Sequence, residues 1–208
     1  MKRVMSLVLL TAVAVTATSG AAFAQNASPD SQLSAGIYQT MRSPAGLVYS
    51  ATVQAKLGLS AAQKHSLQTI RHAASRYDLV KNGINTSDPK ALEAGIKKYL
   101  AAFRASSYGV LSLDQKEELF RIYLQKHHYA ALNDVDVQAE FGVTDEQADE
   151  IAAANRLYLQ AEDMIEDSKQ PSGQKASAEA QAQQDFDARV EKTLTSEQEV
   201  KYRSMLGA

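Results

Sequence analysis

Apolar residues recur along this chain at the three- and four-residue spacing of amphipathic helices, and no segment alternates with the two-residue period of a strand. The pattern predicts a long helix from Ser60 to Asn82 and Gly83, and a second from Pro89 to Gly109 after an Asp88 cap. Further helices are expected over residues 44–58, 112–132, 134–142, 144–165 and 176–192, and from residue 195 onward. The sequence therefore predicts an all-α fold.

Two phrases of this pattern occur twice. VQAKLGLSAAQ over residues 53–63 returns as VQAEFGVTDEQ over residues 137–147, and LSLDQ over residues 111–115 returns as LTSEQ over residues 194–198. The offset is 84 residues for the first pair and 83 for the second. A fixed offset indicates internal repetition. We therefore expect two helical units, residues 44–133 and residues 134–208.

Each phrase ends in Ser or Thr followed three residues later by Gln, which is the signature of a helix capping box. The hydroxyl accepts from the third helical N–H, and the Gln side chain accepts from the N–H of the cap residue. The Leu or Val before each cap is placed to act as a hydrophobic staple. The motif residues are Leu59, Ser60, Gln63, Leu111, Ser112, Gln115, Val143, Thr144, Gln147, Leu194, Thr195 and Gln198.

The N-terminal end predicts export. Lys2 and Arg3 precede an apolar stretch, and an Ala-Phe-Ala cleavage site ends at Ala24, so residues 1–24 are expected to be a signal peptide. Residues 25–43 form a polar segment whose first part, residues 25–34, is predicted to be disordered. No other apolar run approaches the length that crosses a bilayer. The expected location is the periplasm.

The two units differ in net charge. Residues 25–133 carry 13 Lys and Arg against 7 Asp and Glu, whereas residues 134–208 carry 7 against 17. Opposite charges on two related units suggest that the units face each other, or face the opposite unit of a second chain. The alternative is that both are ordinary solvated helix surfaces.

Candidate chemistry is sparse. The chain has no cysteine, which excludes disulfides, thiolate metal sites and thiol catalysis. His65 and His72 lie two helical turns apart, and His127 and His128 point to different sides, so no compact metal site or cofactor is expected. Adjacent carboxylates do not face each other on a helix, and no nucleophile elbow, P-loop or zinc-protease motif is present. Enzymatic activity and nucleic-acid binding are therefore not expected.

The repeated [LV]-[ST]-x-x-Q helix starts in an exported, cysteine-free helical chain resemble those of the Spy/CpxP-like periplasmic proteins, the LTxxQ-motif family. The resemblance extends over roughly residues 43–206. It implies a thin, curved helical layer that binds unfolded or partly folded envelope proteins without ATP. This chain departs from the family in carrying two units, which implies either an intrachain pseudo-dimer or a homodimer.

The resemblance also implies a basic client-binding face, which only the first unit offers. Its client-binding residues would be Lys64, Arg71, Lys97, Lys98 and Arg104. The preferred function is that of an exported, ATP-independent holding chaperone. The alternative is an envelope-stress or metal-responsive adaptor that binds one regulatory partner, with no nucleic acid and no stable membrane insertion in either case.

Overall fold

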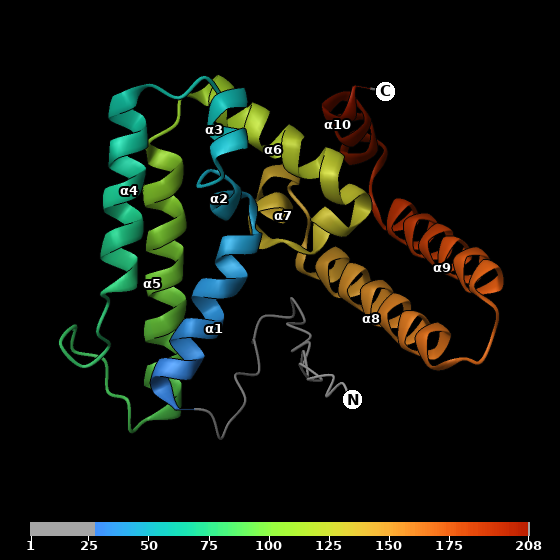
Figure 1. Cartoon of the computed structure of the whole chain (residues 1–208), viewed down its shortest axis with the longest axis horizontal. Helices are drawn as coiled ribbons and strands as arrows, with labels where there is room; N and C mark the ends of the chain where they lie inside the picture. Colours follow the sequence, from blue (N-terminus) through green and yellow to red (C-terminus); the bar gives the residue numbers. More distant parts are fainter. Residues whose placement is uncertain (1–27, 208) are drawn as a thin grey trace, which may run out of the picture.

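A computed structural model describes residues 28–207 of the chain, and all of the regular elements in this range are helices (Figure 1). The all-α prediction is confirmed. The expected signal peptide lies outside the described residues, and none of the helices within residues 28–207 is long and apolar enough to cross a membrane. The elements are α1 (Pro29–Arg42), α2 (Pro44–Leu47), α3 (Ala51–Lys56), α4 (Ala61–Ser75), α5 (Pro89–Gly109), α6 (Leu113–His127), the 3-10 helix η1 (His128–Asn133), α7 (Val135–Phe141), α8 (Asp145–Asp167), α9 (Ser172–Thr193) and α10 (Ser196–Leu206).

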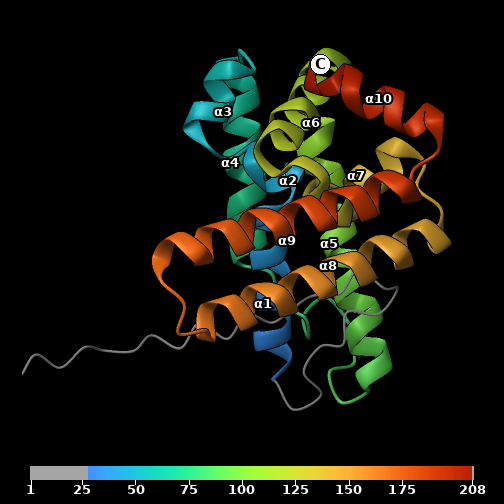
Figure 2. The ribbon, with the colours of Figure 1, turned by 90° about the vertical axis from the view of Figure 1, so that its right-hand side faces the viewer.

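Two helical hairpins dominate the molecule. Helices α4 and α5 form the first, and α8 and α9 form the second (Figure 1). Each hairpin follows a short helix, α3 or α7, and precedes a single helix, α6 or α10. The hairpins run in different directions, and α8 and α9 cross the view in front of α1 and α5 (Figure 2). This order of elements follows the order of the repeated sequence phrases.

The buried apolar residues form three clusters. One gathers Leu57 and Leu67 with Leu119 of α6, at the open end of the first hairpin, where α3 leads into α4. The largest gathers Phe120 of α6 with residues of η1, α7, α8, α9 and α10. Helix α6 therefore contributes neighbouring residues to the cores of both halves. The halves are packed together through α6 as well as through the chain connection.

The third cluster depends on α1, where the sequence predicted disorder up to residue 34. The structure contradicts that prediction, because Ser28 caps a helix that has Pro29 at its first position. Leu33 on this helix is buried against Ile96 and Leu100 of α5. A side chain at Gly36 would come within 2.6 Å of Leu100 Cδ1, so glycine lets α1 approach α5 closely.

Helix α4 ends earlier than predicted, at Ser75 instead of Gly83. Beyond it, Tyr77 stacks on Tyr99 with ring centroids 3.7 Å apart, and Leu79 is buried in the third cluster. Burial of these side chains compensates for the helical hydrogen bonds that the segment gives up. Gly83, at a φ of +74°, serves a turn instead of a helix end.

Two other predicted helices are interrupted. The segment 44–58 contains α2 and α3 with a break at residues 48–50, and the helix expected to reach Leu132 stops at His127 and continues as η1. His128 has a φ of +48°, which an α-helix does not accept. The 3-10 helix that follows His127 places Leu132 fully buried in the largest cluster.

Candidate functional site

All four expected capping boxes are present. Ser60, Ser112, Thr144 and Thr195 each accept from the backbone N–H of the Gln three residues later, and each Gln accepts from the N–H of its cap residue. Residues around each cap fold in this way because the orphan N–H groups of a helix start need local acceptors. The capping bond uses the Oε1 atom of each glutamine, so the Nε2 group remains able to donate to other acceptors.

In the first half those Nε2 groups join two helix starts to two helix ends. Gln63 Nε2 donates to Gln115 Oε1 at 2.7 Å and to the Val110 carbonyl, at the end of α5, at 2.9 Å. Gln115 Nε2 donates to the Leu57 carbonyl, at the end of α3, at 3.2 Å. The ends of α3 and α5 and the starts of α4 and α6 therefore meet at one pair of amides. We call this arrangement a glutamine junction.

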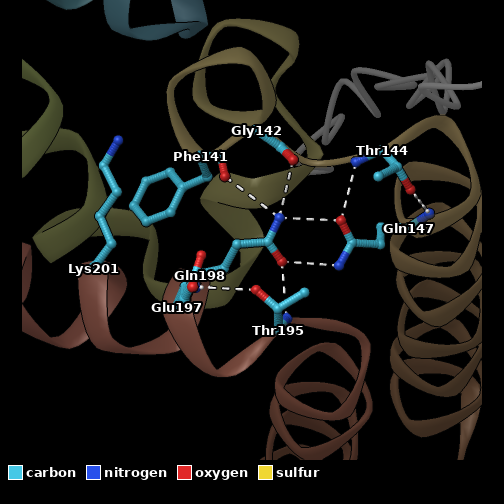
Figure 3. A pocket seen from close by; sticks show the side chains of 8 residues that line it. All are labelled: Phe141, Gly142, Thr144, Gln147, Thr195, Glu197, Gln198 and Lys201. Atoms are coloured by element: carbon cyan, nitrogen blue, oxygen red, sulfur yellow. Dashed lines mark hydrogen bonds between the residues drawn. The ribbon is translucent and has the colours of Figure 1, made fainter.

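The second half has a matching junction (Figure 3). Gln147 Nε2 donates to Gln198 Oε1 at 2.8 Å and to the Thr193 carbonyl at 2.7 Å. Gln198 Nε2 donates to Gln147 Oε1 at 3.1 Å and to the carbonyls of Gly142 at 3.0 Å and Phe141 at 3.4 Å. The amides of both side chains point at each other and are fully occupied.

The earlier residues of the repeated motif, before the cap, also make the same contacts in both halves. Gln54 Nε2 donates to the Val48 carbonyl at 3.0 Å, and 84 residues later Gln138 Nε2 donates to the Leu132 carbonyl at 2.9 Å. The shared glycine adopts the left-handed conformation in both copies, with φ of +61° at residue 58 and +63° at residue 142. That conformation favours glycine and ends a helix. The phrase therefore describes a structural joint between helices.

A shallow hollow of about 440 Å³ lies over the second junction, lined in part by Phe141, Gln147, Gln198 and Lys201. Lys201 Nζ sits 5.2 Å from the centroid of the Phe141 ring and pairs with a Glu140 carboxylate oxygen at 3.0 Å. The two glutamine amides of the hollow are thus bonded to each other, and Lys201 is paired with Glu140 beside it. We interpret the hollow as part of the joint.

The five residues expected to bind clients differ in their exposure and in their ion pairs. Arg71 and Lys98 are exposed and form no ion pair within residues 28–207, and Lys64 is half-buried. Lys97 is exposed, but its Nζ lies 2.8 Å from Glu93 Oε1. Lys97 is therefore already paired with a carboxylate, and the client-binding role of these residues stays a prediction.

Arg104 was expected on a client-binding face, which requires an exposed side chain, and the structure contradicts that exposure. Its side chain is only 22% exposed, and its Nε lies 3.1 Å from Asp136 Oδ1 at the start of α7. Tyr108 donates to the other oxygen of Asp136 at 2.7 Å. This contact of α5 with α7 is the one ion pair that joins the two halves within the described residues. Arg104 therefore supports the fold.

A second carboxylate lies beside this contact. Asp134 caps α7 by accepting from the N–H groups of Asp136 and Val137. Burial, together with the charge of Asp136, raises the pKa of Asp134 to about 6. Burial and the neighbouring carboxylate also raise the pKa of Tyr108 well above its usual value. This part of the interface is therefore sensitive to protonation.

Histidines and carboxylates assemble no metal site, since no group of three potential ligands occurs within the described residues. His127 instead packs on Tyr123, with ring centroids 4.4 Å apart. Burial, with smaller contributions from nearby cations, lowers the pKa of His127.

The feature that sequence reasoning missed is the outer surface of the α8–α9 hairpin. Leu157 and Met164 of α8 are 49% and 75% exposed, although they lie on an amphipathic helix. A shallow groove of about 670 Å³ runs between the helices, with Ala153, Ala154, Leu157 and Ala188 among its lining residues. The spacing of Leu157 and Met164 was visible in the sequence, but only the arrangement of the helices leaves them uncovered.

The same hairpin concentrates negative charge. Helix α8 contains eight Asp and Glu residues and one Arg. None of these carboxylates forms an ion pair with any residue between 28 and 207. The hairpin is thus a strongly acidic arm with a groove that has an apolar floor and charged side chains of both signs along its sides.

Comparison with known proteins identifies no relative: no family model, no curated protein and no solved structure matches this chain.

Proposed function

We propose that this protein is an exported, Spy/CpxP-like protein that holds unfolded or partly folded envelope proteins by non-covalent contact, without ATP. The observation that carries the proposal is the exposed pair Leu157 and Met164 on the α8–α9 hairpin. Exposed large apolar side chains are typical of interaction sites, and Leu157 also lines the groove between the two helices. Export and the family assignment rest on the signal-peptide pattern and on the repeated helix starts.

Physical considerations favour holding over chemistry. When a client's apolar side chains cover exposed apolar area of the protein, binding is favoured by roughly 25 cal/mol per Å² of apolar area removed from water. The glutamine junctions hold the hairpin at its base, where Gln147 and Thr193 are bonded at 2.7 Å. The arm is therefore supported at one end and open along its length. This arrangement suits capture of segments with little sequence specificity.

The experiment is an aggregation-suppression assay with the purified protein and two unrelated unfolding clients at near-equimolar ratio, followed by light scattering. We expect the wild type to delay aggregation of both. The variant with Leu157→Ser and Met164→Ser should lose most of this effect. A control variant with Leu113→Ser and Val200→Ser, which removes two side chains that are 85% and 68% exposed elsewhere, should retain it.

Absence of suppression by the wild type would reject the holding function and favour the adaptor that binds one regulatory partner. Equal loss in both double variants would show that general surface hydrophobicity is responsible, and that the hairpin is not the site.

A further inference from the structure

The groove between α8 and α9 has a floor of small apolar side chains. Ala153, Ala154 and Ala188 line it beside Leu157, and Glu150 and Asp185 add carboxylates. Arg189 and Lys192 of α9 lie along the opposite side. Small residues let a helix backbone approach closely, while Leu157 offers one larger apolar contact. The groove therefore fits an amphipathic helix.

The length of the apolar stripe sets the length of the occupant. Ala153, Leu157, Ala161 and Met164 follow one another on α8 at spacings of four, four and three residues, so they share a face. From the first to the last the helix rises about 16 Å, which is roughly three turns. Ala153 and Leu157 line the groove, and Ala161 and Met164 continue the same face of α8 beyond it, so a client helix of about 11 residues would cover the stripe.

Charge sets the chemistry of the occupant. Residues 145–193 carry twelve acidic and five basic residues, and the carboxylates of α8 have no ion-pair partner among the described residues. An occupant with Lys or Arg beside its apolar stripe would place these cations along α8. Within the groove itself Arg189 and Lys192 offset Glu150 and Asp185, so the negative charge that would repel an acidic occupant is the surplus along α8.

A second copy of this chain fits the groove less well. Its unpaired cations on α4 and α5 would suit the acidic arm. However, neither of those helices presents any of the large exposed apolar side chains found in the described chain. Helix α4 or α5 of a second copy would therefore bring no large exposed apolar side chain to Leu157 and Met164.

We propose that the α8–α9 groove binds cationic amphipathic helices of about three turns. This inference rests on the proposed holding function and gives its client class, which is opposite in charge to the acidic clients that a basic face would attract.

The test uses a fluorescently labelled 11-residue peptide of Leu and Lys whose leucines recur at helical spacing. Two matched peptides serve as controls: one in which Glu replaces Lys, and one with the same Leu and Lys content in an order that forms no apolar face. Binding to the full protein is followed by fluorescence anisotropy. We expect the Leu/Lys amphipathic peptide to bind about tenfold or more tightly than either control, and to weaken at 1 M salt because screening shortens the Debye length from about 10 Å to about 3 Å.

Variants locate the site. The Leu157→Ser and Met164→Ser variant should weaken the peptide about tenfold, since each side chain loses an apolar contact. Glu150→Gln with Glu146→Gln should weaken it several-fold and reduce the salt dependence. The control pair for charge is Glu117→Gln with Asp114→Asn on α6, which should change neither.

Three results would overturn the inference. The first is equal binding of the Leu/Lys and Leu/Glu peptides. The second is unchanged binding in the serine variant, with circular dichroism showing that it is folded. The third is a dimer in sedimentation velocity that the Leu157→Ser and Met164→Ser substitutions dissociate, since a second copy would then occupy the groove. Aggregation suppression without the peptide preference would reject only this inference, and peptide preference without suppression would reject only the holding function.

Discussion

Gln198 offers the sharpest test of the glutamine junction. Its side chain is 9% exposed, and its amide takes part in five hydrogen bonds. Gln198→Ala would remove all five and leave the carbonyls of Phe141 and Gly142 without this donor. At about 0.5–1.5 kcal/mol net for each of the four good bonds, and with the weak 3.4 Å bond discounted, we expect a loss of about 2–6 kcal/mol in unfolding free energy.

The neighbouring cap provides the comparison. Thr195→Ala removes one acceptor, the hydroxyl that receives the Gln198 N–H at 3.2 Å, and should cost about 1 kcal/mol. A capping box considered alone would make the Gln the less costly of the two residues to replace. The junction reverses that order, because the Gln also bonds to Gln147 and to the end of α7.

The measurement is urea unfolding followed by circular dichroism, with Gln160→Ala on the exposed face of α8 as the matched control, expected to change stability by less than about 0.5 kcal/mol. The double variant of Gln147→Ala and Gln198→Ala should cost less than the sum of the two single changes, because either change alone breaks both bonds of the amide pair. A Gln198→Ala variant no less stable than Thr195→Ala would refute the reasoning, as would strict additivity in the double variant.

Three further predictions follow from the interface between the halves and from the histidines. The pKa of Asp134 is raised from 3.8 to about 6 in the folded protein, so the folded state holds this proton more tightly than the unfolded state. The resulting stability is fully present below pH 3.8 and is lost as the pH rises to about 6. Urea melts across this range should lose the pH dependence in the Asp134→Asn variant. Arg104→Ala should lower the unfolding free energy by about 1–3 kcal/mol, because it leaves Asp136 half-buried without its cation, and a double-mutant cycle with Asp136→Asn should give clear coupling. Titration calorimetry with zinc, copper or nickel should find no stoichiometric site tighter than about micromolar, and tight binding that a His65→Ala change abolishes would contradict this.

The helix starts were readable from the sequence because their determinants are local. The cap residue, the third helical residue and the apolar residue before the cap lie within five positions. Thr144 and Gln147 therefore predict the start of α8 independently of the rest of the chain. The turn at Gly142 is equally local, since its φ of +63° selects glycine. The cap at Ser28, which begins α1, is a local signal of the same kind, but disorder was predicted there from the polarity of the segment.

Other features depend on residues far apart in the chain, and local patterns do not contain them. The early end of α4 follows from the stacking of Tyr77 on Tyr99, 22 residues later. Arg104 resembles the other cations of the first half until α7 brings Asp136 to it. In the same way the caps specify where four helices begin, but only the tertiary structure joins Gln147 to Gln198 across 51 residues and leaves Leu157 uncovered. Short-range hydrogen bonding determines where helices start and stop, whereas burial and pairing are decided by whichever surfaces the folded chain brings together.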